Sequence, residues 1–354
     1  MPPTTVLVVD DSALMRRALK GILSERGFEV HTARNGVDAL EQLSRLRPDV
    51  ITLDINMPEM DGLSCLSRIM QDQPTPVIMV SSLTDRNALV TLEAMELGAV
   101  DYVPKPGGTV SLNIEEISGE LVRKVQGAAS AKLSRASGLS ARIRARKVGA
   151  GTTPPMREAP LPAGEVDLVL VGSSTGGPAL LSDLLPELPG TLGAPVVVAQ
   201  HIPASFTAPL ARRLDELCAL RVHEVNRIMP VQRGNIYIGR GNADVVVARR
   251  GSGLIVKSVP AAEEYRWHPS VDRLVASARR YCDPARLVCV LLTGMGDDGA
   301  AEMAAVRQDG GRTIAESEET AIVWGMPGEL ARRGGATAVL PADAIARRLA
   351  DWVR

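Results

Sequence analysis

The stretch DLVLVGSSTGGP, residues 167–178, decides the fold of the second half of this chain. A short apolar run rich in Val and Leu is typical of a buried parallel strand, and the glycines that follow lead to Pro178, which suits the first turn of a helix. Two further runs have the same form: APVVVAQHIP at 194–203 and LVCVLLTGMGDDG at 287–299. We therefore predict a doubly wound, mostly parallel α/β fold whose site lies at the carboxyl ends of the strands.

Each of these three runs ends in a different polar side chain. Ser174 follows the first, His201 the second, and Asp297 and Asp298 the third. A serine, a histidine and an aspartate are the side chains of an acyl-transfer hydrolase, and G-x-S-x-G glycines permit the sharp turn that exposes the serine. The same glycine-rich loop also suits a phosphate-binding turn. Spacing alone decides neither between these two readings nor between the two aspartates, and the order Ser, His, Asp disfavours the α/β-hydrolase superfamily.

The first half alternates strands and helices in the same way. Its strand candidates are VLVVD, FEVHTA, DVITLD, PVIMVSS and DYVPK. Five strands with intervening helices predict a flavodoxin-type domain. Asp10, Asp11 and Asp54 stand at the ends of two of the strands, and clustered carboxylates of this kind favour a magnesium ion as ligand.

Length and composition bound the class of protein. A chain of 354 residues accommodates two domains. The net charge of −1 and the aromatic content of 3% argue against a nucleic-acid surface. Four cysteines without metal or disulfide spacing indicate free thiols in a reducing compartment. The sequence has neither a signal peptide nor an apolar run long enough to span a membrane, so we expect a cytoplasmic protein that is not membrane-embedded.

The amino-acid composition changes between the two halves. From residue 126 to 164 the chain is rich in Gly, Ser, Ala and Pro, and its charges are mainly basic. We predict a linker there, between a domain at 1–125 and a domain at 165–354. A charged spacer and a contact with acidic surfaces both fit this segment, and the spacer is favoured.

The landmarks of the first half together resemble a response-regulator receiver domain. They are Asp10, Asp11, Asp54, Asn56, Met57, Pro58, Asp61, Gly62, Ser81, Lys105 and Pro106. The resemblance implies that Asp54 accepts a phosphoryl group from a partner histidine kinase. It also implies Mg²⁺ held by Asp10, Asp11, Asp54 and the carbonyl of Asn56, with Lys105 beside the phosphate. Ser81 and Tyr102 would sense the phosphate and re-pack the surface.

The second half resembles the chemotaxis protein-glutamate methylesterases, the CheB family. The segments that carry the resemblance are GSSTGGP, QHIPASFTAPLARRL, HPSVDRL, LLTGMGDDGA and WGMPGEL, in the order of that family. By this resemblance Ser174 is the nucleophile, His201 the base and Asp298 the residue that orients it, and Asp297 is a spectator. Backbone amides near Thr175 and Met295 would stabilise the oxyanion, and the catalytic domain would need no cofactor.

The resemblance also implies a reaction and its control. The substrates would be glutamate methyl esters and glutamines on the cytoplasmic helices of chemoreceptors, and the unphosphorylated receiver would limit access to the crevice. One departure stands out: Glu316 and Ser317 replace the Gln and Asp that are common in the family. The alternative to an enzyme is a signalling adaptor with a non-catalytic second domain. A transcriptional regulator is disfavoured, because the second half offers no helix-turn-helix.

Overall fold

The chain divides into two compact units, Met1–Gly138 and Leu139–Arg354. The computed structural model describes residues 3–82, 85–105, 110–131 and 166–353. The greater part of the predicted linker at 126–164 lies outside the described residues, and its first residues, up to Ala129, belong to a helix. The domain boundaries from the sequence therefore stay predictions.

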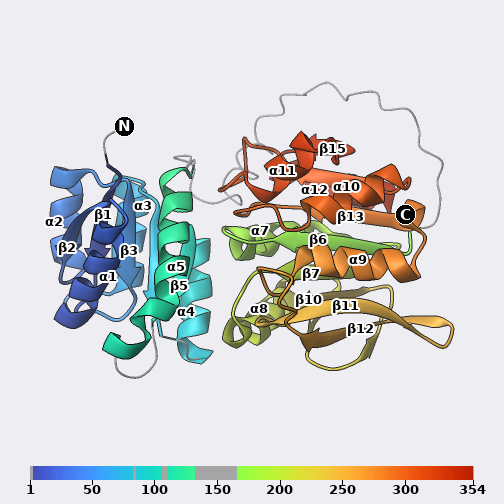
Figure 1. Cartoon of the computed structure of the whole chain (residues 1–354), viewed down its shortest axis with the longest axis horizontal. Coiled ribbons are helices and arrows are strands. Elements are labelled where there is room, and N and C mark those ends of the chain that lie inside the picture. Colours follow the sequence, from blue (N-terminus) through green and yellow to red (C-terminus); the bar gives the residue numbers. More distant parts are fainter. Residues whose placement is uncertain (1–2, 83–84, 106–109, 132–165, 354) are drawn as a thin grey trace. The chain divides into compact units, whose positions relative to one another are not determined.

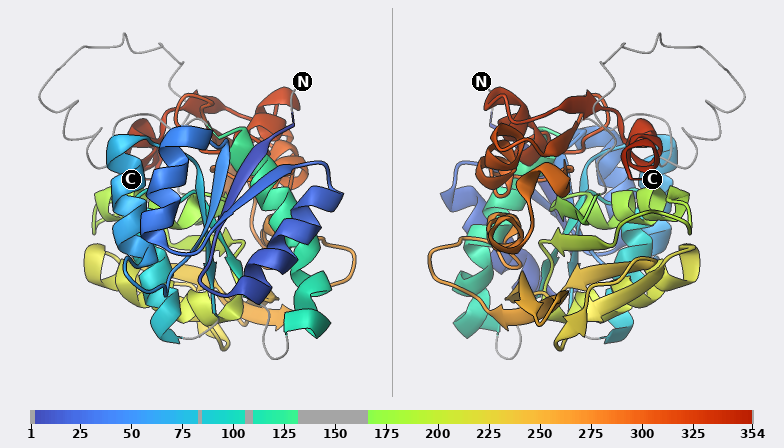
Figure 2. Two further views of the ribbon diagram at one scale, coloured as in Figure 1. Left: turned by 90° about the vertical axis from the view of Figure 1, so that its left-hand side faces the viewer. Right: turned by 90° about the vertical axis from the view of Figure 1, so that its right-hand side faces the viewer.

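The first unit is a five-stranded sheet with helices on both faces. Its elements are β1 (Thr5–Val9), α1 (Ala13–Glu25), β2 (Glu29–Ala33), α2 (Gly36–Leu46), β3 (Val50–Asp54), α3 (Gly62–Asp72), β4 (Val77–Ser81), α4 (Asp85–Glu96), β5 (Asp101–Pro104) and α5 (Val110–Ala129). The strand order is β2-β1-β3-β4-β5, and every pairing is parallel. In Figure 2, left, α1 and α5 cover one face and α2, α3 and α4 the other. The predicted flavodoxin-type fold is confirmed.

Local chemistry explains where these helices begin. Ser12, Asn35 and Asp61 precede α1, α2 and α3, and each side chain accepts a hydrogen bond from a backbone amide in the first turn. Such caps satisfy amides that have no partner within the helix. The apolar residues of α1 recur every four positions, so one face of the helix is buried on the sheet.

The second unit contains a larger, entirely parallel sheet. Its elements up to the hairpin are β6 (Leu168–Ser173), α7 (Gly177–Leu184), β7 (Val196–Gln200), α8 (Ala204–Leu217), β8 (Arg221–Val225), β9 (Met229–Pro230), β10 (Asn235–Gly239), β11 (Ala243–Arg250) and β12 (Gly253–Pro260). Then follow α9 (Val271–Tyr281), β13 (Leu287–Leu291), α10 (Ala300–Gln308), β14 (Arg312–Glu316), α11 (Met326–Arg332), β15 (Ala338–Leu340) and α12 (Ala342–Trp352). Figure 1 labels most of these elements.

The order of this sheet is β15-β14-β13-β6-β7-β10-β8. Helix α10 contacts both α9 and α11, and α7 contacts both α8 and α12. A separate antiparallel sheet has the order β11-β12-β9. The mostly parallel α/β class is confirmed. The strand candidates of this half were DLVLVG, APVVVAQ, NIYIG, DVVVARR, LIVKS, RLVCVLLTG and TAVL. Strand β14 was not among them, because its sequence RTIAE begins and ends in charged residues around a buried Ile.

Candidate active site and receiver site

Three neighbouring strands of the larger sheet carry the predicted catalytic residues. Strand β6 lies between β13 and β7, and all three run parallel. Ser174 directly follows β6, His201 directly follows β7, and Asp298 lies in the turn after β13. Because parallel strands present their carboxyl ends at one edge, residues far apart in sequence are brought to one place.

Backbone and side-chain hydrogen bonds join the first two of these strand ends. The amide of His201 donates to the carbonyl of Ser173 at 3.0 Å. Gln200 is buried, and its Nε2 donates to the carbonyls of Ser174 and His201 at 3.0 Å each. Its Oε1 accepts from Ser173 Oγ at 2.6 Å. The serine and histidine turns are therefore held in fixed register.

The turn after β13 lies against Ser174. The Ser174 amide donates to the carbonyl of Thr293 at 3.0 Å, and Thr293 Oγ1 donates to the carbonyl of Thr175 at 2.9 Å. A Cβ added to Gly294 would stand 2.7 Å from Ser174 Cβ. Only a glycine allows this approach, so Gly294 brings the third strand end against the candidate nucleophile.

His201 and Asp298 form a buried pair. His201 Nε2 lies 2.8 Å from Asp298 Oδ2. The other ring nitrogen, Nδ1, is buried and has no hydrogen-bond partner among the described residues, so the Ser174 hydroxyl is not bonded to it in this structure. An ionised carboxylate only accepts hydrogen bonds, so Nε2 carries the proton and Nδ1 is left as the basic nitrogen.

The surroundings of Asp298 keep its carboxylate charged. Besides His201, it accepts from the amides of Val271 and Asp272 at 2.7 and 2.9 Å and from Ser270 Oγ at 3.0 Å. These donors form the beginning of helix α9. Burial raises the pKa of Asp298, but the hydrogen bond and charge of His201 and the two amides lower it by more, so the pKa lies below its usual range.

The predicted oxyanion residues flank Ser174. Thr175 follows it at the start of the turn into α7 and is buried. Met295 is half-buried and follows Gly294, which lies close to Ser174 in the turn after β13. Their amides therefore belong to the turn that holds Ser174 and to the turn after β13 that lies against it. The predicted spectator, Asp297, is exposed.

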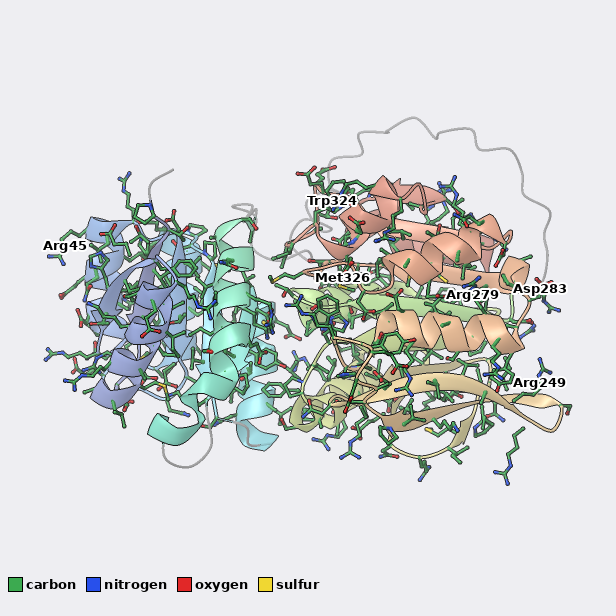
Figure 3. The ribbon with its side chains drawn as sticks, viewed as in Figure 1. Arg45, Arg249, Arg279, Asp283, Trp324 and Met326 are labelled. Carbon is green, nitrogen blue, oxygen red and sulfur yellow. The ribbon has the colours of Figure 1, made fainter. Side chains whose placement is uncertain are left out.

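Glu316 lies behind this edge of the sheet, at the end of β14, and is 1% exposed. Its Oε2 accepts from the Thr293 amide at 2.7 Å, and its Oε1 accepts from Thr320 Oγ1 at 2.9 Å. Its backbone carbonyl accepts from Nε1 of Trp324 at 2.8 Å; Trp324, labelled in Figure 3, lies just before α11. The departure noted in the sequence is thus a buried acid that holds the turn beside Ser174.

Substitution of Glu316 by Gln should change how stability depends on pH. Burial raises the pKa of Glu316 to about 7, although the bonds from Thr320 and Thr293 lower it. The folded chain thus binds this proton more tightly than the unfolded chain. The stabilising contribution of Glu316 is complete below its usual pKa of 4.5 and is lost as pH rises through about 7. Glutamine does not titrate, so the free energy of unfolding of Glu316→Gln relative to that of the wild type should increase by up to roughly 3 kcal/mol between pH 5 and 8.

Denaturant unfolding at several pH values measures this difference. Exposed Glu319 supplies the control, because Glu319→Gln should run parallel to the wild type. A constant difference between Glu316→Gln and the wild type across that pH range would show that Glu316 does not titrate as a buried acid.

The receiver landmarks converge at the carboxyl end of the smaller sheet. Oxygen atoms of Asp10, Asp11 and Asp54 all lie within 4.8 Å of one another. Lys105 Nζ lies 2.9 Å from Asp10 Oδ2 and 2.8 Å from Asp54 Oδ2. Burial raises the pKa of Asp54, and Lys105 lowers it only in part, so the net direction is upward. Such an all-oxygen donor set fits a hard divalent cation.

The remaining predicted receiver residues lie on β4, on β5 and just after β3 of the same sheet. Ser81 is buried at the end of β4, and Tyr102 is buried in β5. Burial raises the pKa of Tyr102 well above its usual range. Lys124 of α5 stands 4.6 Å from the centroid of the Tyr102 ring. Asn56 is exposed and follows Asp54 by two positions. Asp10, Asp54, Ser81, Tyr102 and Lys105 are thus at least partly buried, whereas Asp11 and Asn56 are exposed.

Sequence reasoning did not assign roles to several residues of the larger site. Gln200, Thr293 and Ser270 form hydrogen bonds to the candidate catalytic turns, and the indole of Trp267 stacks on the His201 ring with centroids 5.8 Å apart. Gln200 and Thr293 directly follow apolar runs of the sequence, which is a signal that could have found them. Trp267 carries no such signal, because it lies in a loop 66 residues from His201 in the numbering.

A phosphoacceptor-type acidic cluster in one domain and convergent Ser, His and Asp residues in another define a response regulator with an enzymatic output domain. A family model described as "Response regulator receiver domain" matches residues 6–114, and one described as "CheB methylesterase" matches residues 169–349. The chain belongs to the CheB methylesterase family.

Similar proteins cover almost the whole chain. A protein-glutamate methylesterase/protein-glutamine glutaminase of Rhodospirillum rubrum is 55% identical over 99% of this chain and 96% of its own length. One of Rhodopseudomonas palustris is 51% identical over 98% of this chain and 97% of its own length. The catalytic domain of the Thermotoga maritima CheB methylesterase is 35% identical in sequence, with a TM-score of 0.51. The match covers 54% of this chain and 100% of that structure.

Proposed function

We propose that this chain is a phosphorylation-regulated hydrolase that demethylates glutamate methyl esters and deamidates glutamines on chemoreceptors, with Ser174, His201 and Asp298 as its catalytic residues. The observation that carries the proposal is the 2.8 Å contact between His201 Nε2 and Asp298 Oδ2, directly beside the turn that holds Ser174. This contact leaves His201 Nδ1 as the nitrogen that can take a proton from the serine.

The chemistry follows from the protonation states. Ser174 Oγ attacks the ester carbonyl while His201 Nδ1 takes its proton, and the resulting imidazolium returns that proton to the leaving methoxide to release methanol. Water then hydrolyses the acyl-enzyme by the same route. A glutamine substrate follows the same steps and releases ammonia instead. The Asp298 carboxylate fixes the tautomer and stabilises the imidazolium.

Stabilisation of the oxyanion falls to the backbone around Ser174. The Thr175 amide lies just before helix α7, whose N-cap is Gly176, and the dipole at this end of the helix favours negative charge. The Met295 amide belongs to the turn that contacts Ser174 from β13. Each such donor is worth roughly 10²- to 10³-fold in rate. No cofactor is needed for these steps.

The receiver supplies the control. Asp54 is the phosphoryl acceptor from a chemotaxis histidine kinase. Asp10, Asp11, Asp54 and the carbonyl of Asn56 would hold a Mg²⁺ ion, which neutralises charge on the transferred group. Lys105 already bridges Asp10 and Asp54 and would bind a phosphate oxygen. Ser81 and Tyr102 would respond to the phosphate and shift the receiver surface toward an active state.

Substitution of Asp54 by Asn tests the receiver assignment. We expect Asp54→Asn to abolish labelling by radioactive acetyl phosphate and any rise in methanol release caused by this phosphodonor. Chelation of Mg²⁺ with EDTA should have the same effect on the wild type. Exposed Asp49 is the matched control, since it precedes β3 at the opposite end of the same strand. Undiminished labelling of Asp54→Asn would contradict the assignment.

The proposed substrate places the protein in the cytoplasm, where the receptor helices and the kinase lie. None of the described helices is long and apolar enough to cross a membrane. The activity itself is tested by methanol release from receptor membranes that carry methylated glutamates, because a protein that only binds receptors would release none.

A further inference from the structure

Trp267 covers one face of the His201 ring. The two rings are nearly parallel, with an interplanar angle of 4° and centroids 5.8 Å apart. This geometry lies within the range of stacked aromatic pairs. The indole is half-buried, and it belongs to the loop between β12 and α9. This loop, residues 261–270, is called the indole loop below.

The same indole also contacts the turn that carries Asp298. A Cβ built on Gly296 would lie 2.7 and 2.8 Å from two atoms of the six-membered ring of Trp267. Gly296 has a φ of +83°, so both its backbone and its missing side chain suit the close approach of the ring. Trp267 therefore packs against the ring of His201 and against the turn that carries Asp298.

The indole loop is anchored by groups other than the indole. Asp244 is fully buried at the start of β11. It accepts hydrogen bonds from the amide of Ala262 at 3.2 Å, the amide of Ser270 at 2.7 Å and His268 Nδ1 at 3.0 Å. Arg273 Nη1 adds a contact of 2.5 Å. Because these bonds hold both ends of the loop, replacing Trp267 should leave the loop in place.

His201 needs such support. Its ring has one hydrogen-bonded nitrogen, Nε2, while Nδ1 has no partner among the described residues. A single hydrogen bond fixes one point of the ring but leaves the imidazole free to tilt about it. A flat ring packed parallel to the imidazole restricts that tilt, and the direction of Nδ1 then depends on packing.

We propose that Trp267 is a positioning residue for His201, which holds the plane of the imidazole so that Nδ1 is presented to Ser174. This inference rests on the proposed function of Ser174 and His201. A misplacement of about 1 Å in a catalytic group can cost on the order of 100-fold in rate. Trp267 thus acts on the chemical step through its neighbour, without a role in proton transfer.

The test compares full-length Trp267→Ala with Trp267→Phe. Two rates are measured: methanol release from methylated receptor membranes, and covalent labelling by a fluorophosphonate probe, which reports the reactivity of the serine. We expect Trp267→Ala to lower kcat and the labelling rate by roughly 10- to 100-fold, with KM changed by less than about threefold. Trp267→Phe, which keeps a ring face, should recover most of both rates.

Arg266 provides the matched control. Its guanidinium lies 5.2 Å from the centroid of the Trp267 ring, and the residue is exposed. Arg266→Gln removes this neighbour of the indole but leaves the stack on His201, so the labelling rate should stay within about twofold of the wild type. If Trp267→Ala folds poorly, Trp267→Leu takes its place, since leucine keeps apolar volume without a ring face.

Two results would overturn the inference. One is a Trp267→Ala or Trp267→Leu enzyme with wild-type kcat and labelling rate. The other is a loss of rate that Trp267→Phe does not recover. A change confined to KM counts in the same way, because it would indicate a contact with substrate. Failure of the proposed function is separate: a wild-type protein that neither labels nor releases methanol, or a His201→Gln variant with full activity, would refute the catalytic assignment itself.

Discussion

Ser174→Ala is expected to reduce methanol release from methylated receptor membranes by about 10⁴-fold or more, to the background rate. The hydroxyl is the proposed nucleophile, and no other group replaces it when the side chain is shortened. The substitution is small and sits at a half-buried position, so the fold should be retained. Release of ammonia from receptor glutamines should fall to the same extent, since both reactions would pass through one acyl-enzyme.

Two controls accompany this variant. Phosphorylation of Asp54 by acetyl phosphate should be unchanged, because Asp54 lies in the other compact unit. The neighbouring Ser173 is buried, and its hydroxyl donates to Gln200. Ser173→Ala should therefore lose a supporting hydrogen bond and less than about tenfold in rate. Ordinary turnover by Ser174→Ala would refute the assignment of the nucleophile.

Asp298→Asn is expected to lower kcat by roughly 10³- to 10⁴-fold. Asn cannot present two anionic oxygens, yet Asp298 faces four donors: His201 Nε2, Ser270 Oγ and the amides of Val271 and Asp272. An amide group placed among donors favours the wrong tautomer of His201 and withdraws the charge that stabilises the imidazolium. KM should change little, because the carboxylate lies behind the imidazole.

Asp297 is the natural control for this prediction. It precedes Asp298 directly but is exposed, so Asp297→Asn should retain a rate within about twofold of the wild type. Because Asp298 also caps helix α9, circular dichroism must show that Asp298→Asn is folded at the assay temperature. A folded Asp298→Asn variant with nearly full activity, or a large loss in Asp297→Asn, would mean that the wrong aspartate has been assigned.

The fold could be predicted largely from apolar periodicity. Strands such as β6, β7 and β13 are buried on both faces, so their sequences are continuous runs of Val and Leu. Strand β14 was not predicted, because it begins at Arg312 and ends at buried Glu316, and charged residues at both ends give the pattern of a loop. The two-residue strand β9 has no pattern of its own, since it forms only by pairing with β12.

The site was less predictable than the fold. Residues that directly follow strands, such as Ser174 and His201, could be named because the topology of a parallel sheet assigns them to one edge. The choice of Asp298 over Asp297 came from family resemblance, and the structure places Asp298 against His201. Trp267 and Asp244 act through contacts across the tertiary structure, and no spacing in the sequence encodes such contacts.

The most direct test of the central claim is to identify the residue that a fluorophosphonate modifies and to follow methanol release as the modification proceeds. We predict a single adduct on Ser174, found by mass spectrometry of its peptide, with activity lost in proportion to labelling and with labelling greatly slowed in His201→Gln. An adduct on another residue, or full methanol release from protein that is completely modified at Ser174, would contradict the account.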